Sequence, residues 1–113
     1  MTSSFKDREK GFEAKYKHDQ EMTFKITARR NKLLGLWAAE QMGLSGVAAE
    51  AYAREVVVAD FDEPGDTDVV RKVLKDLADK GVEMTEHRLR KEMDRLGAAA
   101  RAQVIAEARP DVK

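Results

Sequence analysis

The sequence predicts an all-α fold, a four-helix bundle with a flexible or lightly docked N-terminal arm. Three observations support this class: four segments with apolar residues every three or four positions, short polar connections between them, and no second strand pattern. The 113 residues suffice for one domain with a modest core. We expect residues 1–19 to form the arm and residues 20–113 to form the bundle.

Composition limits the classes of function. The chain has no cysteine, which excludes a disulfide and a thiolate metal site and suits a cytoplasmic protein. It contains neither a run of about 18 apolar residues nor the apolar core of a signal peptide, so we predict no membrane span. Lys plus Arg and Asp plus Glu both number 21, and this even balance gives no support to a nucleic-acid partner.

The charges are nevertheless distributed unevenly along the chain. Residues 44–66 contain six acids and one base, whereas residues 21–43 contain four bases and two acids. We expect these opposite charges to attract each other within the fold.

The predicted arm is a mostly charged segment with few apolar residues. Ser4 and Asp7 fit a capping box, so a helix could begin there. Phe5, Phe12 and Tyr16 are spaced so that all three would lie on one narrow face of that helix. Such a seam is too small to hold a short helix firmly. The segment is therefore either a lightly docked first helix or a disordered arm that folds against a partner.

A central helix is predicted from Phe24 to Met42, with Gly43 as its left-handed cap. Gly35 costs roughly 1 kcal/mol of helix propensity relative to Ala, and a close helix crossing is the expected compensation. Asn31 is expected in a narrow strip left to water. Apolar residues on two nearly opposite sides predict neighbours on both: Met22, Ile26, Leu33, Leu36 and Trp37 on one, Phe24, Ala28, Gly35 and Met42 on the other.

Three further helices are expected after a turn at residues 44–46. Their N-cap residues and their glycine or proline stops place them at about 46–60, 66–80 and 85–108. Three consecutive valines at 56–58 favour a strand, but no second strand pattern exists to pair with them, so we predict a helix. The predicted core positions are Ala48, Tyr52, Val56 and Ala59, then Val69, Val70, Val73, Leu74 and Leu77, then Leu89, Met93, Leu96, Ala100 and Val104.

Sites for metal or catalytic chemistry are not predicted. The acidic loop at residues 60–66 could suggest calcium, but Pro64 interrupts the alternating pattern of an EF-hand loop. His18 and His87 lie in charged stretches without a zinc-binding spacing, and no glycine-rich phosphate loop follows a strand. The sequence therefore gives no positive argument for an enzyme.

Several motifs occur in a recognisable order along the chain. They are DRE at residues 7–9, FEAKY at 12–16, ARRNKLLGLWAAE at 28–40 and ADF at 59–61. Together with the sequence between them, from about Phe5 to Leu77, they closely resemble the zeta subunit of the α-proteobacterial F-type ATP synthase, an ATPase inhibitor family. The resemblance is weaker along the predicted fourth helix.

The resemblance implies an endogenous inhibitor of ATP hydrolysis rather than an enzyme. Its partners would be the α, β and γ subunits of the catalytic head, which would hold it at the inner face of the cell membrane. The arm would enter a catalytic αβ interface as a helix and block rotation in the hydrolytic direction. The alternative is a nucleotide-responsive regulatory or assembly module of the synthase with weak or no inhibition.

No cofactor is expected to be required, although the family is associated with weak adenine nucleotide binding on the bundle, for which no residue is assigned. The partner-binding residues are expected in the arm. Its aromatic residues would anchor the helix in an apolar groove, and its charges would set the register and select the partner. These residues are Phe5, Asp7, Arg8, Glu9, Lys10, Phe12, Glu13, Lys15 and Tyr16.

Overall fold

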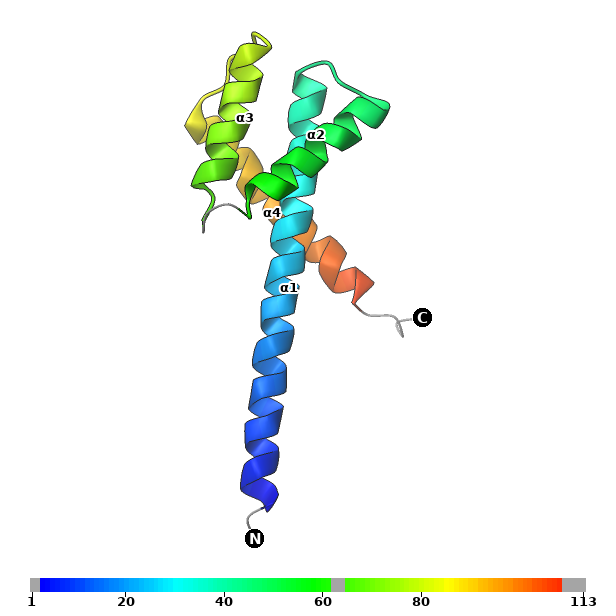
Figure 1. Ribbon diagram of the computed structural model, residues 1–113, viewed down its shortest axis with the longest axis vertical. Helices are drawn as coiled ribbons and strands as arrows, with labels where there is room; N and C mark the ends of the chain where they lie inside the picture. The colour runs from blue at the N-terminus through cyan, green and yellow to red at the C-terminus, as the bar shows by residue number, and fades with distance from the viewer. Residues whose placement is uncertain (1–2, 62–64, 109–113) are drawn as a thin grey trace.

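The computed structural model describes residues 3–61 and 65–108, with side chains from residue 18 onward. These residues form four α-helices and no strand, which confirms the predicted all-α class and the helix over the valine run (Figure 1). The helices are α1 (Ser3–Gln41), α2 (Gly46–Ala59), α3 (Thr67–Asp79) and α4 (Glu86–Glu107).

Helix α1 joins the predicted arm and the predicted central helix in one unbroken helical backbone. Its 39 residues correspond to roughly 58 Å at 1.5 Å per residue. The N-terminal half extends beyond the other helices, and the chain measures 68 × 35 × 22 Å (Figure 1). The predicted start at Phe24 is therefore wrong. Residues 5–23 contain no proline, and a helix that is already nucleated propagates at little cost through charged helix formers.

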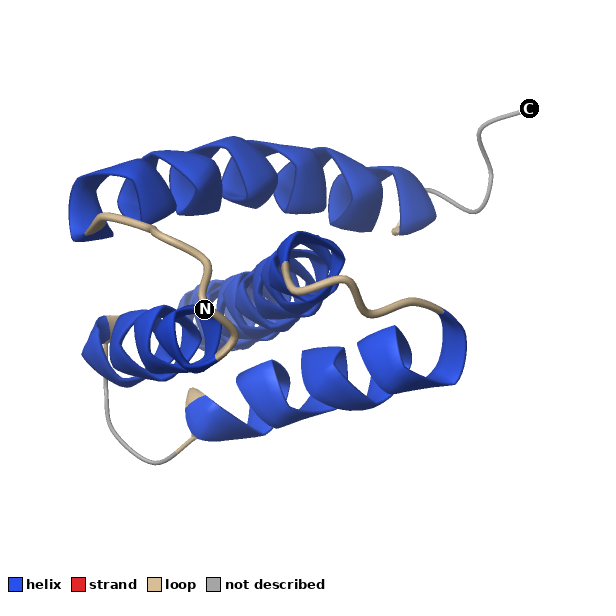
Figure 2. Cartoon of the chain, turned by 90° about the horizontal axis from the view of Figure 1, so that it is seen from above, coloured by secondary structure: helices blue, strands red, loops and turns tan. Residues whose placement is uncertain are grey.

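The C-terminal half of α1 is the centre of the bundle, as predicted. It contacts all three other helices, and α2 and α4 make the larger interfaces with it. Seen along α1, α4 crosses on one side while α2 and α3 lie on the other (Figure 2). None of the helices in the described part of the chain combines the length and the hydropathy that a membrane span requires.

The core positions predicted on α3 and α4 are confirmed. All five residues on α4 are buried, as are four of the five on α3, and Leu74 is partly buried against the core. On α2, Tyr52 and Val56 are buried as expected, but Ala48 is exposed, and Ala49 and Ala53 are buried instead. Alanine is too small and too weakly apolar to fix a helix face by pattern alone, so the prediction was wrong at Ala48, while Ala59 is half-buried.

The two predicted apolar sides of the central helix are only partly correct. Leu33, Leu36 and Trp37 are half-buried at the edge of the core, whereas Leu34, Ala38 and Ala39 are fully buried. Asn31 is also fully buried, which contradicts the expectation that it faces water, and Phe24 is 58% exposed. These positions depend on where three neighbouring helices begin and end, which the periodicity of α1 does not encode.

The close crossing predicted at Gly35 is confirmed. A Cβ built on Gly35 would lie 2.6 Å from the Cα of Ala53 on α2 and 3.2 Å from its Cβ. Backbone therefore meets backbone where the two helices cross, and any side chain at residue 35 would force them apart.

The helix ends agree with the predicted caps in position but not always in chemistry. Gly43 and Gly81 have φ of 79° and 75°, the left-handed conformation expected of helix stops. The Thr85 hydroxyl accepts the backbone N–H three residues later at 3.1 Å. Ser45 and Asp66 occupy N-cap positions without a side-chain capping bond; the Asp66 carboxylate instead contacts α1.

Candidate functional site

The predicted partner-binding residues all lie on the N-terminal half of α1. The helical backbone is described there from Ser3, but the side chains of residues 3–17 lie outside the described part of the structure. The aromatic seam, the charges around it and the capping box at Ser4 and Asp7 therefore stay predictions. The described side chains begin at the end of the arm.

The junction between arm and bundle is a stretch of exposed helix. Residues 18–21 are all exposed, and Met22 is the first half-buried residue among the described side chains of α1. The Thr23 hydroxyl donates to the Asp19 carbonyl at 2.9 Å, across the expected boundary between arm and bundle. The arm is thus a direct continuation of the helix that is gripped by the bundle.

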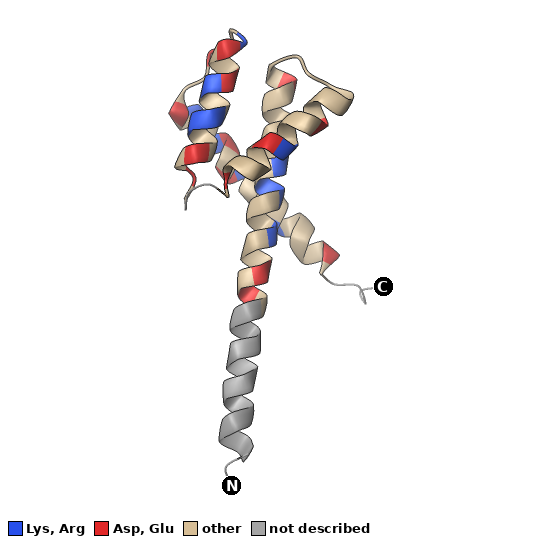
Figure 3. Ribbon diagram, viewed as in Figure 1, with Lys and Arg blue, Asp and Glu red and all other residues tan. Residues whose placement is uncertain are grey.

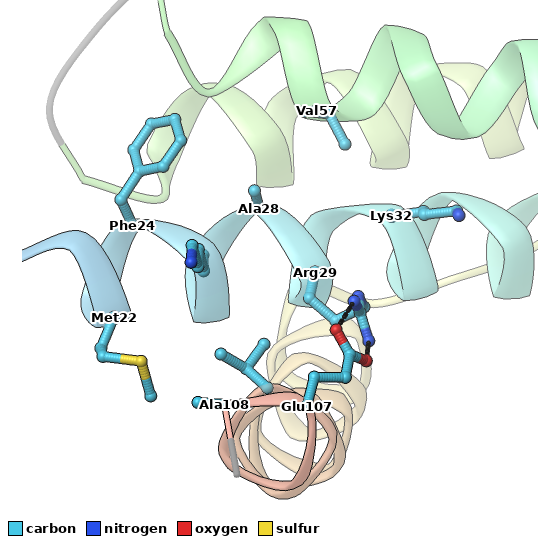
Figure 4. A pocket seen from close by; sticks show the side chains of 10 residues that line it. Met22, Phe24, Ala28, Arg29, Lys32, Val57, Glu107 and Ala108 are labelled. Atoms are coloured by element: carbon cyan, nitrogen blue, oxygen red, sulfur yellow. Dashed lines mark hydrogen bonds and ion pairs between the residues drawn. The ribbon is translucent and has the colours of Figure 1, made fainter. Parts of the chain in front are cut away.

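Arg29 holds α1 to the C-terminal end of α4. Its Nη1 and Nη2 donate to the two carboxylate oxygens of Glu107, each at 2.7 Å (Figure 4). Nη1 also donates to Gln103 Oε1 at 2.9 Å. The hydrogen bond from Arg29 lowers the pKa of Glu107, and the same bond raises the pKa of Arg29. Because both groups are open to solvent, this pair contributes orientation more than energy.

Arg30 joins α1 to the loop before α3. Its Nη2 donates to Asp66 Oδ1 at 2.7 Å, and Nε and Nη2 donate to Asn31 Oδ1 at 3.2 and 2.9 Å. A guanidinium has no acceptor, so these bonds also fix which end of the Asn31 amide faces Arg30. The Arg30–Asp66 pair is an example of the attraction predicted between the basic and acidic segments. Arg29 instead pairs with Glu107 of α4.

A groove of about 390 Å³ lies between α1, α2 and α4 beside the junction (Figure 4). The Arg29–Glu107 pair forms part of its wall. The Lys and Arg residues on the described part of α1 gather at the level of the neighbouring helices (Figure 3). The apolar lining of the groove comes from three helices and includes Met22, Phe24, Ala28, Val57 and Val104.

Two exposed aromatic rings lie beside the groove, and one of them, Phe24, also lines it. Phe24 of α1 and Phe61, which follows α2, stack with centroids 5.9 Å apart and planes inclined by 17°. They are 58% and 60% exposed. We call these two residues the aromatic patch. The sequence predicts Phe24 on an apolar side of the helix and contains Phe61 only in the ADF motif. Their pairing joins residues far apart in the sequence, so no local pattern indicates it.

Tyr52, Lys72 and Asp76 form a polar cluster between α2 and α3. The Tyr52 hydroxyl donates to Asp76 Oδ2 at 2.8 Å, and Lys72 Nζ donates to the same oxygen at 3.0 Å. Burial and then the bond to Asp76 raise the pKa of Tyr52, so the phenol stays protonated. His18 and His87 are exposed. Within the described ranges, no three His, Cys, Asp or Glu side chains are grouped as metal ligands.

Comparison with known proteins identifies the family. A family model described as ATPase inhibitor subunit zeta matches residues 1–103. The chain belongs to this family. The match confirms the resemblance inferred from the motifs, and it extends through most of α4, where the motifs were weaker. Membership of the zeta family makes an inhibitory role toward an ATPase the general function of the chain.

A solved structure with a similar sequence shares the fold of this chain. It is a solution NMR structure of a protein whose sequence is 53% identical to this one, and the two superpose with a TM-score of 0.68. The match covers 76% of this chain and 98% of the other chain. No curated protein matches the chain.

Proposed function

We propose that this zeta-family protein inhibits ATP hydrolysis by the F-type ATP synthase. The N-terminal half of α1 enters a catalytic αβ interface of the head and blocks rotation in the hydrolytic direction. The protein is a regulator without enzymatic activity of its own, requires no cofactor and contacts the α, β and γ subunits. It is cytoplasmic and is held at the inner face of the cell membrane through the synthase. Membership of an ATPase inhibitor family is the observation that carries this proposal.

The length of α1 supports this role for the arm. Residues 3–22 form a helix roughly 30 Å long that continues a segment packed between α2 and α4. Because the packed segment nucleates the helix, the arm avoids much of the entropic cost that an isolated helix of this length would meet on binding. The other three helices are too bulky to follow it into a narrow interface, so the bundle limits the depth of insertion.

The chemistry of the arm suits an apolar groove between subunits. Phe5, Phe12 and Tyr16 would bury their rings there, and burial of three aromatic side chains is enough to dominate the binding energy of a small interface. The six flanking charged residues would contact the rim of the groove, where complementary charges select the partner and the register. A helix held this way would keep the interface from closing around nucleotide.

The test is ATP hydrolysis by the isolated catalytic head of the cognate synthase. We expect the full-length protein to inhibit, and a version that begins after Asp19 to leave hydrolysis unchanged while retaining the helical circular dichroism and cooperative unfolding of a bundle. Equal inhibition by the shortened protein would move the function from the arm to the bundle.

The groove favours a second candidate function. Its apolar lining would contact the adenine ring, and the lining residues Lys25, Arg29 and Lys32 would contact the phosphates of an adenine nucleotide. Such binding is expected of a nucleotide-responsive regulatory or assembly module. A ligand that binds only the folded state raises the melting temperature. A concentration-dependent rise with ATP or ADP, lost in a Lys25→Ala, Lys32→Ala variant, would support this alternative.

A further inference from the structure

We propose that the aromatic patch, Phe24 and Phe61, is a second docking surface for the same catalytic head that receives the arm. It would bury its two rings against an apolar area on the outside of the head, beside the entrance through which the arm passes. The inference rests on the proposed function, and it adds a contact made by the bundle.

In the described part of the chain, three of the four strongly exposed large apolar residues lie at or next to this patch. Among the described residues, four large hydrophobic side chains are strongly exposed: Phe24, Val47, Val58 and Phe61. Phe24 and Phe61 stack on each other, and Val58 lies one turn before Phe61, whose N–H donates to the Val58 carbonyl at 3.0 Å. Val47 lies alone in the first turn of α2, near its opposite end. Single exposed apolar residues are ordinary, but a cluster containing stacked aromatic rings is typical of an interaction site.

The patch is continuous with the end of the arm. Phe24 lines a hollow with Asp19, Gln20 and Thr23 on one side, and a second hollow of about 160 Å³ that it shares with Phe61 on the other. Phe24 follows Asp19 by five positions, about 7.5 Å along the same helix. A partner that held the arm as far as its last turn would reach Phe24 next.

The stack does not belong to the core of the fold. Neither ring is among the buried core residues or among the partly buried residues packed against them. Helices α1 and α2 are already held together by the backbone contact at Gly35 and by the buried residues around it. Replacing the two rings should therefore leave the bundle folded, so their exposure is more readily explained by a partner than by stability.

Two attachment points would explain how the bundle is oriented on the head. Once the arm is inserted, docking of the patch is intramolecular, and a modest apolar contact then adds strongly to the overall affinity. The surroundings fit such a contact, because Lys25 lines the groove on one side of Phe24 and Asp60 borders the hollow that Phe24 shares with Phe61, which gives the apolar centre a polar rim of both signs. The head is expected to present an apolar area with a mixed polar border.

The experiment compares full-length proteins with an intact arm. Phe24→Ser with Phe61→Ser should raise the concentration for half-inhibition of ATP hydrolysis by the isolated head at least tenfold, which corresponds to about 1.4 kcal/mol. Saturating protein should still inhibit fully, because the arm is unchanged. Val47→Ser, which removes an even more exposed apolar side chain near the start of α2, should stay within twofold of the original. If the double variant is misfolded, Phe61→Ser alone replaces it, because this residue lies outside every described helix. The single variant should show a smaller rise in the concentration for half-inhibition.

Three results would overturn the inference or separate it from the proposed function. Unchanged half-inhibition by a folded patch variant would overturn it. A change from dimer to monomer in light scattering, with unchanged inhibition, would assign the patch to a second copy of the chain and would also overturn it. The original protein could bind the head without inhibiting it, and the patch variant could lose that binding. This result would support the docking surface and contradict the proposed inhibition. Absence of both binding and inhibition would reject both.

Discussion

The two halves of α1 are parts of one helix with opposite relations to their surroundings. In the C-terminal half, Leu34, Gly35, Ala38 and Ala39 are buried against the other helices. The N-terminal half carries a charged sequence with few apolar residues and extends past the bundle (Figure 1). Under the proposed function, one half serves the stability of the fold and the other binds the partner. Substitutions in the two halves should therefore have separable effects.

The largest effect on function is expected in the arm. Phe5→Ala with Phe12→Ala should abolish inhibition of ATP hydrolysis, because it removes two of the three aromatic anchors. The melting temperature should change little, since every core residue in the described part of the chain lies between Leu34 and Val104. Thermal unfolding and hydrolysis assays of the same preparation check both parts. A large loss of stability would show instead that the arm is packed on its own bundle.

The other half of α1 should show the reverse behaviour. Gly35→Ala places a Cβ 2.6 Å from the backbone of Ala53, and such overpacking costs typically 1 to 3 kcal/mol, which exceeds the gain of about 1 kcal/mol in helix propensity. We expect a lower free energy of unfolding in urea, with inhibition retained by the protein that remains folded.

A matched control for this substitution is Gly97→Ala on α4. A Cβ there would meet only the Arg30 side chain, at 3.6 Å, which is ordinary contact. The propensity gain should then prevail, stabilising the protein by up to about 1 kcal/mol. Opposite signs at the two glycines are the expected outcome, and destabilisation of equal size at both would show that the α1–α2 crossing is not unusually close.

A smaller effect is expected where α2 meets α3. Tyr52→Phe removes the hydroxyl that donates to Asp76 at 2.8 Å while keeping the buried ring. Lys72 still donates to the same carboxylate, so the Asp76 oxygen keeps a partner. The loss should be about 1 kcal/mol in urea unfolding, and inhibition should be unchanged. A change in inhibition with the same stability would place this face of the bundle at the interface with the head.

The same division explains what could be predicted from the sequence. On α3 and α4, strong periodicity fixed the buried faces because each helix has one wet side and large aliphatic residues on the other. On α1 and α2, alanine-rich faces and several neighbours left the pattern ambiguous, so buried Asn31 and exposed Phe24 were both misplaced. The arm was assigned through motifs shared with a family, whereas the stack of Phe24 on Phe61 depends on the α1–α2 crossing and is visible only in three dimensions.

The smallest effect is expected at Glu107, where α4 is tied to α1 just inside the junction. Because Arg29 holds the folded-state pKa of this carboxyl below its ordinary value of 4.5, the charged pair stabilises the fold above that pH and loses its contribution as the pH falls through the folded-state pKa. Glu107→Gln should therefore lower the urea midpoint slightly at pH 7 and not at all in acid. Gln103→Ala removes an uncharged acceptor of the Arg29 guanidinium. Its effect on the urea midpoint should therefore not change as the pH falls through the pKa of Glu107. If the Glu107→Gln difference is the same at every pH, the charge of the pair makes no contribution to stability, and the end of α4 is held to α1 by packing and uncharged hydrogen bonds.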